Sequence, residues 1–225
     1  MQLGIIGGIG PAATDYYYRK LISKFASENE TLDMTIVHAD TPTLLNNLEK
    51  DNTDAQVEIY THLTNRLSLA GARCVAITSI AGHFCIEEFT KVSPLPVINM
   101  LSCVEDEVVK QGYRKIGILG TMTVMESKFY SGISSAEVVT PRGHLLDDVH
   151  CAYVGMAKAG AVNDEQRNIF DNACDHLFNE AKVDAVMLGG TDLALVYSNK
   201  ISDFELIDCA EIHVDSLFNY FKENK

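Results

Sequence analysis

Positive charge is scarce in this sequence. Its 225 residues include 18 Lys and Arg against 31 Asp and Glu, which gives a formal net charge of −13. Nucleic acid and anionic membrane surfaces repel such a chain, so we expect neither as a partner. The sequence also lacks an apolar run long enough to cross a bilayer and the basic-then-apolar start of a signal peptide. We therefore expect a cytoplasmic protein.

Paired cysteine motifs are missing as well. The six cysteines form no CxxC pair, and no histidine stands at zinc-ligand spacing from them. This pattern indicates neither a disulfide framework nor a metal site, so we predict no bound metal. In a reducing compartment we expect Cys74, Cys103, Cys174 and Cys209 to be small core residues.

No linker rich in Pro, Gly or Ser interrupts a regular alternation of short β-branched runs with longer amphipathic stretches. The predicted strands are residues 3–8, 34–39, 74–79, 96–100, 115–121, 136–140, 185–190 and 204–208. The predicted helices include residues 16–25, 55–71, 104–112 and 168–181. Nearly all-apolar strands separated by helices are typical of parallel sheets covered on both faces, so the predicted fold class is α/β.

The two halves of the chain resemble each other. LGIIGGI matches IGILGTM after 113 residues, and VAITSI matches VMLGGT after 111 residues. Such similar spacing predicts two pseudo-symmetric lobes, which we place at residues 1–97 plus 209–225 and at residues 98–208. The carboxyl ends of the matching strands would then face each other across a cleft, where ligands of open α/β sheets bind.

The stretch GIIGGIGPAAT turns from an apolar strand into glycines and then a predicted helix. Gly8, Gly10 and Ala13 fit the dinucleotide fingerprint, which expects an acidic residue about 20 positions further on. The candidate, Asp40, comes 27 positions after Ala13 and is therefore late. We expect Pro11 to begin a helix whose free N–H groups favour an anion, which can be a carboxylate or a phosphate. A nicotinamide-binding protein stays open as an alternative.

GIIGGIGPAAT with the tyrosine-rich segment after it resembles the N-terminal signature of the cofactor-independent aspartate/glutamate racemase family. ITSIAGH, LGTMTVMESKFY, AKAG, MLGGTDLALV and IDCAEIH resemble further motifs of that family, in the family's order. The resemblance implies two pseudo-symmetric α/β lobes with the active site between them, and a homodimer. It also implies a small carboxylate or amino-acid ligand and no nucleotide, metal or pyridoxal cofactor.

The family moves a Cα proton with two thiols, one from each lobe, and the resemblance places Ser79 and Gly190 at those two positions. A serine hydroxyl is a far weaker acid than a thiol and needs a neighbouring base, whereas glycine offers no side chain at all. Ile80 and Ala81 also stand where Asn-Thr is usual, which makes the pocket more apolar. We therefore expect two-thiol racemisation to be impaired.

Other groups are candidates for the missing chemistry. His83 could act as a base or support the site from behind, and Asp192 could act as a base or, as we favour, cap a helix. Lys158 is the candidate charge partner for an acid, while Cys85, Asp208 and His213 are expected to pack or support. The residues predicted to bind substrate are Gly8, Gly10, Thr14, Ile80, Ala81, Thr121, Thr123, Lys158 and Thr191.

Two functions lead at this point. The first is an enzyme of the racemase family with weak or altered activity on a small carboxylic or amino acid. The second is a non-catalytic protein that binds a small acid in the same place.

Overall fold

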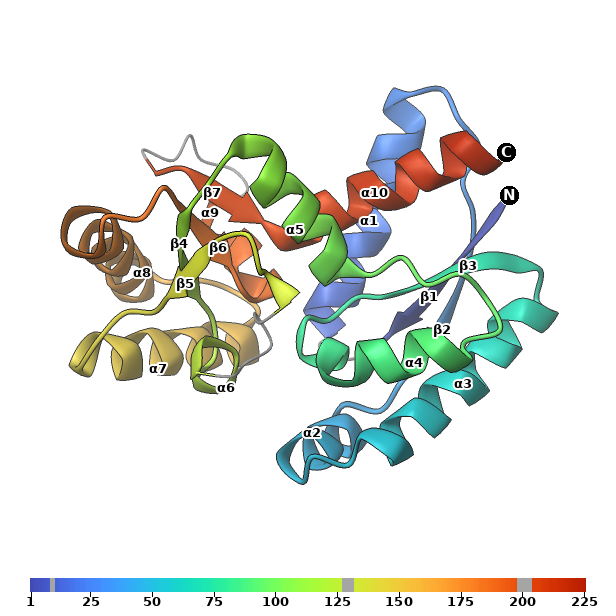
Figure 1. Cartoon of the computed structure of the whole chain (residues 1–225), viewed down its shortest axis with the longest axis horizontal. Coiled ribbons are helices and arrows are strands. Elements are labelled where there is room, and N and C mark those ends of the chain that lie inside the picture. Colours follow the sequence, from blue (N-terminus) through green and yellow to red (C-terminus); the bar gives the residue numbers. More distant parts are fainter. Residues whose placement is uncertain (9–10, 127–131, 198–203) are drawn as a thin grey trace. The chain divides into compact units, whose positions relative to one another are not determined.

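Two compact units make up the protein, for which a computed structural model describes residues 1–8, 11–126, 132–197 and 204–225 (Figure 1). Unit 1 comprises Met1–Cys103 with Ala210–Lys225, and unit 2 comprises Val104–Cys209. Each unit contains one parallel sheet flanked by helices. The predicted α/β class, with one parallel sheet in each lobe, is confirmed.

The sheet of unit 1 has the strand order β2-β1-β3, with β1 Gln2–Gly7, β2 Asp33–His38 and β3 Ala72–Ile77. The central strand β1 is buried from its second residue onward, as expected for a strand paired on both sides and covered on both faces. The helical elements that begin in unit 1 or return to it are α1 Pro11–Ser27, α2 Thr41–Glu49, α3 Thr53–Leu69, the 3-10 turn η1 Ala81–Cys85, α4 Ile86–Val92, α5 Met100–Gln111 and α10 Cys209–Asn224. Helix α1 begins at Pro11, as predicted.

A fourth strand of this sheet is shorter than predicted. Of the predicted strand 96–100, only Val97 pairs, in one parallel bridge with Val75 of β3. The proline before Val97 has no N–H to donate, and α5 begins at Met100, so the pairing cannot extend in either direction.

The sheet of unit 2 has the order β5-β4-β6-β7, with β4 Lys115–Leu119, β5 Glu137–Val139, β6 Ala185–Leu188 and β7 Leu206–Asp208. With the Val97 bridge counted, unit 1 has the same arrangement, because β2, β1, β3 and the bridge correspond in order to β5, β4, β6 and β7. The repeat seen in the sequence is therefore a repeat of strand order.

Helices of unit 2 surround its sheet and share its core. They are α6 Met122–Glu126, α7 His144–Ala159, α8 Asp164–His176 with the π-helix η3 Leu177–Ala181, the 3-10 turn η4 Thr191–Leu193 and α9 Ala194–Tyr197. Helix α8 begins with a capping box, in which Asn163 and Gln166 each accept from the other's backbone N–H. The core joins β4 and β6 to one face of α7 and one face of α8.

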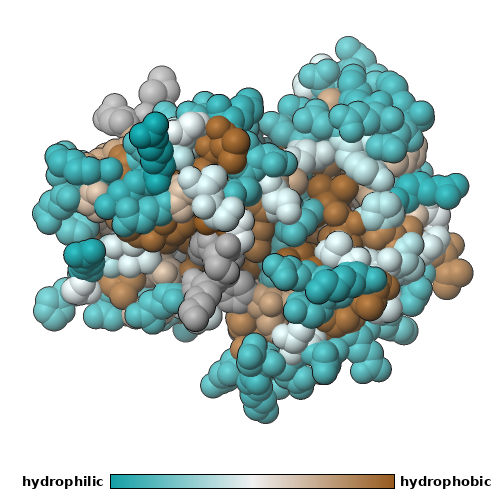
Figure 2. All heavy atoms as spheres, viewed as in Figure 1, coloured by the Kyte–Doolittle hydropathy of each residue, from teal (hydrophilic) through white to brown (hydrophobic). Residues whose placement is uncertain are grey.

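The part of the surface that Figure 2 shows is largely hydrophilic. Hydrophilic side chains cover much of the face of each unit seen in Figure 2. No helix in the described part of the chain is long and apolar enough to span a membrane. Cys74, Cys174 and Cys209 are buried, as predicted, but Cys103, on α5, is only partly buried.

Candidate functional site

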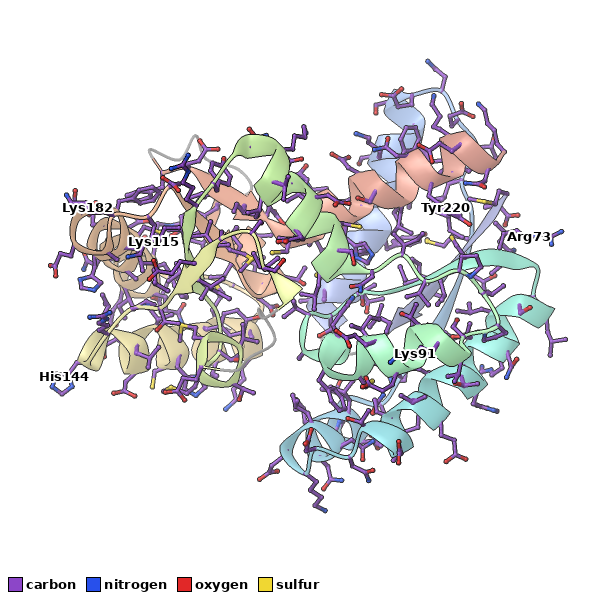
Figure 3. All side chains as sticks on the ribbon, in the orientation of Figure 1. Arg73, Lys91, Lys115, His144, Lys182 and Tyr220 are labelled. Carbon is purple, nitrogen blue, oxygen red and sulfur yellow. The ribbon has the colours of Figure 1, made fainter. Side chains whose placement is uncertain are left out.

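Most of the residues predicted to carry chemistry lie just beyond the carboxyl ends of strands. In unit 1, Gly8 follows β1, and Ser79 lies two residues beyond the end of β3. In unit 2, Thr121 lies two residues beyond the end of β4, and Gly190 lies two residues beyond the end of β6. Lys115, labelled in Figure 3, is the first residue of β4 and marks the opposite edge of its sheet. Because parallel strands end at one edge, each unit gathers its candidates at a single edge.

The turn after β1 requires glycine. Gly8 has φ +93°, and a Cβ there would overlap His38 Nδ1 and lie 2.5 Å from the carbonyl oxygen of Ala39. The Gly8 N–H donates to Thr14 Oγ1 at 2.8 Å, and Thr41 Oγ1 donates to the Gly8 carbonyl at 2.5 Å. Thr14, predicted to bind substrate, thus also holds the turn.

A pocket of about 400 Å³ opens beside this turn within unit 1. It is lined by Gly7, Gly8, Thr14, Asp15, Tyr18, Ile36 and His38. The predicted ligand-binding residues Gly8 and Thr14 are therefore together, whereas Gly10 lies outside the described residues.

Asp40 is engaged in local structure. Its Oδ2 accepts from the N–H of Thr43 at 2.9 Å and from the Thr43 hydroxyl at 2.6 Å, so it caps the N-terminus of α2. These hydrogen bonds lower the pKa of the Asp40 carboxyl. The carboxylate that a dinucleotide site would use for ribose already has a structural role, which disfavours the nicotinamide alternative.

Ser79 is partly exposed, and its hydroxyl makes no hydrogen bond to any described residue. Its carbonyl oxygen instead receives two donors, the N–H of Gly82 at 3.1 Å and Nδ1 of His83 at 2.7 Å. The next residues, Ile80 and Ala81, lead into η1, with Ile80 buried and Ala81 partly buried. Within the described part of unit 1, no base is therefore hydrogen-bonded to the serine hydroxyl to raise its reactivity.

His83 is buried, and the backbone uses both of its ring nitrogens. Because Nε2 accepts from the N–H of Met100 at 3.3 Å, the neutral ring carries its proton on Nδ1, which donates to the Ser79 carbonyl. Burial lowers the pKa of His83 to about 4. The imidazole holds the turn that carries Ser79 and presents it with no free nitrogen, so the structure favours the supporting role over the predicted base.

His213 of α10 continues this network inside unit 1. Its Nδ1 accepts from the Tyr17 hydroxyl at 2.7 Å, and its Nε2 donates to the carbonyl of Ile98 at 2.8 Å. Burial and the neighbouring His83, whose ring centroid lies 6.2 Å away, lower the pKa of His213 to about 3. Both histidines are therefore neutral supports of the folded unit.

In unit 2, the loop after β4 is held by side-chain caps. Thr121 Oγ1 accepts from the N–H of Val124 at 3.3 Å, and His150 Nδ1 on α7 accepts from the N–H of Met122 at 3.0 Å. Thr121 is half-buried and Thr123 is exposed on α6. The Thr121 hydroxyl therefore helps to begin α6 at the edge where a ligand would bind.

The space beside Gly190 is occupied by an aromatic ring. A Cβ at position 190 would overlap the phenolic oxygen of Tyr153 and lie 2.6 Å from two of its ring carbons. Tyr153 is 8% exposed, and its hydroxyl donates to Asp192 Oδ2 at 2.9 Å. Burial and the adjacent Asp192 carboxylate raise the pKa of the Tyr153 phenol. Tyr153 thus fills the volume into which a side chain at position 190 would project.

Asp192 lies in the turn η4, whose first residue is the half-buried Thr191. We favoured Asp192 as the N-terminal cap of a helix, but it lies inside η4, and the residue at the capping position of that turn is Gly190. The carboxylate of the half-buried Asp192 is instead the acceptor for the Tyr153 phenol.

Lys158 is exposed in the last turn of α7. It follows Tyr153 by five positions, which places it about 140° around the helix from the face that meets Gly190. Its charge is well placed to stabilise the carboxyl end of α7. A role in binding a carboxylate stays a prediction.

Comparison with known proteins now identifies the family. Residues 6–217 match the family model described as Asp/Glu/Hydantoin racemase. The chain belongs to the Asp/Glu/Hydantoin racemase family.

Solved structures with the same fold extend across the whole chain. An aspartate racemase homologue from Pyrococcus horikoshii OT3 is 25% identical, with a TM-score of 0.86 over 98% of this chain and 99% of that one. The aspartate racemase of Picrophilus torridus is 22% identical, with a TM-score of 0.74 over 97% and 93%. A glutamate racemase from Francisella tularensis, in complex with D-glutamate, is 16% identical, with a TM-score of 0.65 over 99% and 81%.

For a racemase-family protein the state of the thiols matters. Burial raises the pKa of Cys74 to about 11 and the pKa values of Cys85 and Cys174 to about 12. Such thiols stay protonated at neutral pH and are poor proton acceptors. The described residues also contain no group of three or more His, Cys, Asp or Glu that could hold a metal ion.

The sequence interpretation missed two residues of this family member. His150 and Tyr153 stand three apart on α7, so they share a face of the helix, and both bind loops at the carboxyl edge of the sheet. The available signal was Gly190, because a position without a side chain inside a packed edge leaves a volume that another residue must fill.

Proposed function

We propose that the protein acts on or binds a small carboxylic or amino acid at the strand ends that carry Ser79 and Gly190, with two-thiol racemisation impaired. Membership of the racemase family supports the ligand class. The observation that carries the impairment is the Tyr153 ring in the space beside Gly190.

Racemisation at a Cα needs a base on one side of the carbon and an acid on the other, both held in place. At Ser79, the nearby His83 does not serve as a base for the hydroxyl, because both of its ring nitrogens are hydrogen-bonded to the backbone. At Gly190 no side chain exists, and the Tyr153 hydroxyl beside it donates to Asp192. Neither residue 79 nor residue 190 itself supplies a side chain that is ready to take a proton from a Cα.

The second candidate function, a non-catalytic small-acid-binding protein, is favoured by the same phenol. Its raised pKa keeps the Tyr153 proton in place at neutral pH. A protein that keeps the binding site without proton transfer would show ligand binding and no turnover.

The test combines exchange and binding on one set of compounds. The protein is incubated in D₂O with both enantiomers of aspartate, glutamate and other amino acids, and deuterium at Cα is followed by NMR. The same compounds, with small carboxylic acids, are tested for a rise in melting temperature. Exchange supports an active enzyme, and a thermal shift without exchange supports the binding protein. If no compound gives either deuterium exchange or a thermal shift, the proposal is contradicted.

We also propose a homodimer, since the resemblance to the racemase family implies one. Sedimentation equilibrium on the full chain measures the mass directly. A single species at the monomer mass across a range of concentrations would contradict it.

A further inference from the structure

We propose that Tyr153 and Asp192 together recognise the amino group of an amino-acid ligand, at the place where the resemblance puts the second thiol. This inference rests on the proposed function and narrows its ligand class from acids in general to amino acids.

The position of the phenolic oxygen is the first step. A Cβ at position 190 would overlap this oxygen, so the Tyr153 hydroxyl stands where a side chain from β6's carboxyl end would begin. The carboxyl edge of this sheet therefore carries the Tyr153 phenol, hydrogen-bonded to the Asp192 carboxylate, where the resemblance would place a thiol.

The hydrogen-bonding capacity of the pair is the second step. A phenol has one proton, and that of Tyr153 is donated to Asp192 Oδ2 at 2.9 Å. What remains is acceptor capacity, namely the lone pairs of the phenolic oxygen and of an ionised carboxylate. An ammonium group carries three donors and a positive charge, and so it complements this pair, whereas a ligand carboxylate would be repelled.

Access is the third step. Tyr153 is 8% exposed, which restricts its ring, while Asp192 is only half-buried as a residue. The proposal therefore expects a ligand to approach from the side of Asp192, next to a phenol that is held in place.

Unit 2 also contains a matched control. The Tyr113 hydroxyl donates to Glu205 Oε1 at 2.6 Å, so the same two groups are paired elsewhere. Tyr113 precedes β4 and Glu205 precedes β7, which places this pair at the amino edge of the sheet, away from the candidate site.

The experiment is calorimetric titration of the full chain with L- and D-aspartate against succinate, and with L- and D-glutamate against glutarate. We expect the wild type to prefer the better-bound amino acid over its des-amino counterpart by about tenfold or more. Tyr153→Phe keeps the ring that fills the space beside Gly190, and it should lose most of that preference while still binding succinate. Asp192→Asn should lose it as well, and Tyr113→Phe should keep it.

Each outcome decides the inference. If the wild type binds the better-bound amino acid and its des-amino counterpart equally well, the inference is overturned and the proposed function is left intact. A Tyr153→Phe variant that loses both ligands to the same extent, or keeps the preference unchanged, also overturns it. If no compound binds the wild type, both proposals fail. Should Asp192→Asn not fold by circular dichroism, Tyr153→Phe alone decides.

Discussion

Tyr153 and Gly190 constrain each other, because the ring lies where any side chain at position 190 would project. Neither residue is informative alone in the sequence: one is a tyrosine in the middle of a helix, and the other is a glycine after a strand. Because of this packing, a side chain introduced at position 190 would have to displace the ring.

Gly190→Ala should therefore lower the free energy of unfolding by about 1–3 kcal/mol, since a Cβ would be forced against the Tyr153 ring. In a Tyr153→Ala background the same substitution should cost much less, because the ring is gone. Urea denaturation of the wild type, both single variants and the double variant measures this coupling. Equal costs in the two backgrounds would show that the ring is not the obstacle.

The activity of variants with cysteine at positions 79 and 190 should also depend on Tyr153. We expect Ser79→Cys with Gly190→Cys to gain little Cα exchange, because the second sulfur has no room beside the ring. Adding Tyr153→Ala should raise deuterium exchange into aspartate or glutamate by roughly 10²-fold over the double variant, the contribution of a placed acid or base. Equal exchange rates in the double and triple variants would contradict this expectation.

At the scale of helices and strands, the site depends on caps at the carboxyl edges of the sheets. Asp40 begins α2, Thr121 supports the start of α6, and His150 holds the same loop from α7. These polar side chains at the strand ends all accept hydrogen bonds from backbone N–H groups.

Asp40→Ala should lower the free energy of unfolding by about 1 kcal/mol, whereas Asp40→Asn should retain most of the stability, because asparagine also caps helices well. Thermal or urea unfolding of the three proteins gives the comparison. A titration of the wild type with NAD and NADP accompanies it, and we expect no binding. Dinucleotide binding that Asp40→Asn abolishes would instead favour the nicotinamide alternative.

Most elements were predictable because their patterns are local. Apolar runs such as LGIIGG mark buried parallel strands, and α1 begins at the proline where the sequence predicts it. The fourth strand of unit 1 was overestimated, since apolar residues at 96–100 suggest pairing, but the proline before Val97 and the start of α5 confine it to one bridge.

The candidate site was only partly predictable, for a physical reason. The strand ends that carry Ser79 and Gly190 follow from the order of elements, which is local information. The hydrogen bond from Met100 N–H to His83 Nε2 joins residues 17 positions apart, and the packing of Tyr153 on Gly190 joins residues 37 positions apart. Nothing in the spacing of single motifs specifies such contacts.

At the scale of the whole molecule, the buried histidine pair makes stability depend on pH. In the unfolded chain an imidazole takes up its proton near pH 6.5, but folded His83 and His213 remain neutral down to about pH 4 and about pH 3. The unfolded state therefore binds more protons in this window. The histidine contribution is fully present above pH 6.5 and is lost as the pH falls toward 4.

We expect the free energy of unfolding to fall by up to about 1.4 kcal/mol per pH unit for each histidine between pH 6 and pH 4.5. Urea unfolding across this range measures the slope. The His83→Gln variant should show a smaller slope of unfolding free energy against pH, by the contribution of one histidine. Replacement of the exposed His62 by Gln should leave the slope unchanged. A wild-type slope near zero in this range would contradict the neutral, buried state of both rings.

Unit 1 is built from two stretches of chain, and this imposes an order on its synthesis. Residues 104–209 leave the ribosome before α10 does, which at about 5–20 residues per second is a delay of roughly 5 to 20 s. Throughout that interval the hydrogen bonds of His213 with Tyr17 and with the Ile98 carbonyl cannot form, whereas unit 2 consists of one continuous stretch of chain. The nascent chain can thus complete unit 2 first, while the first 103 residues still lack the helix that completes unit 1.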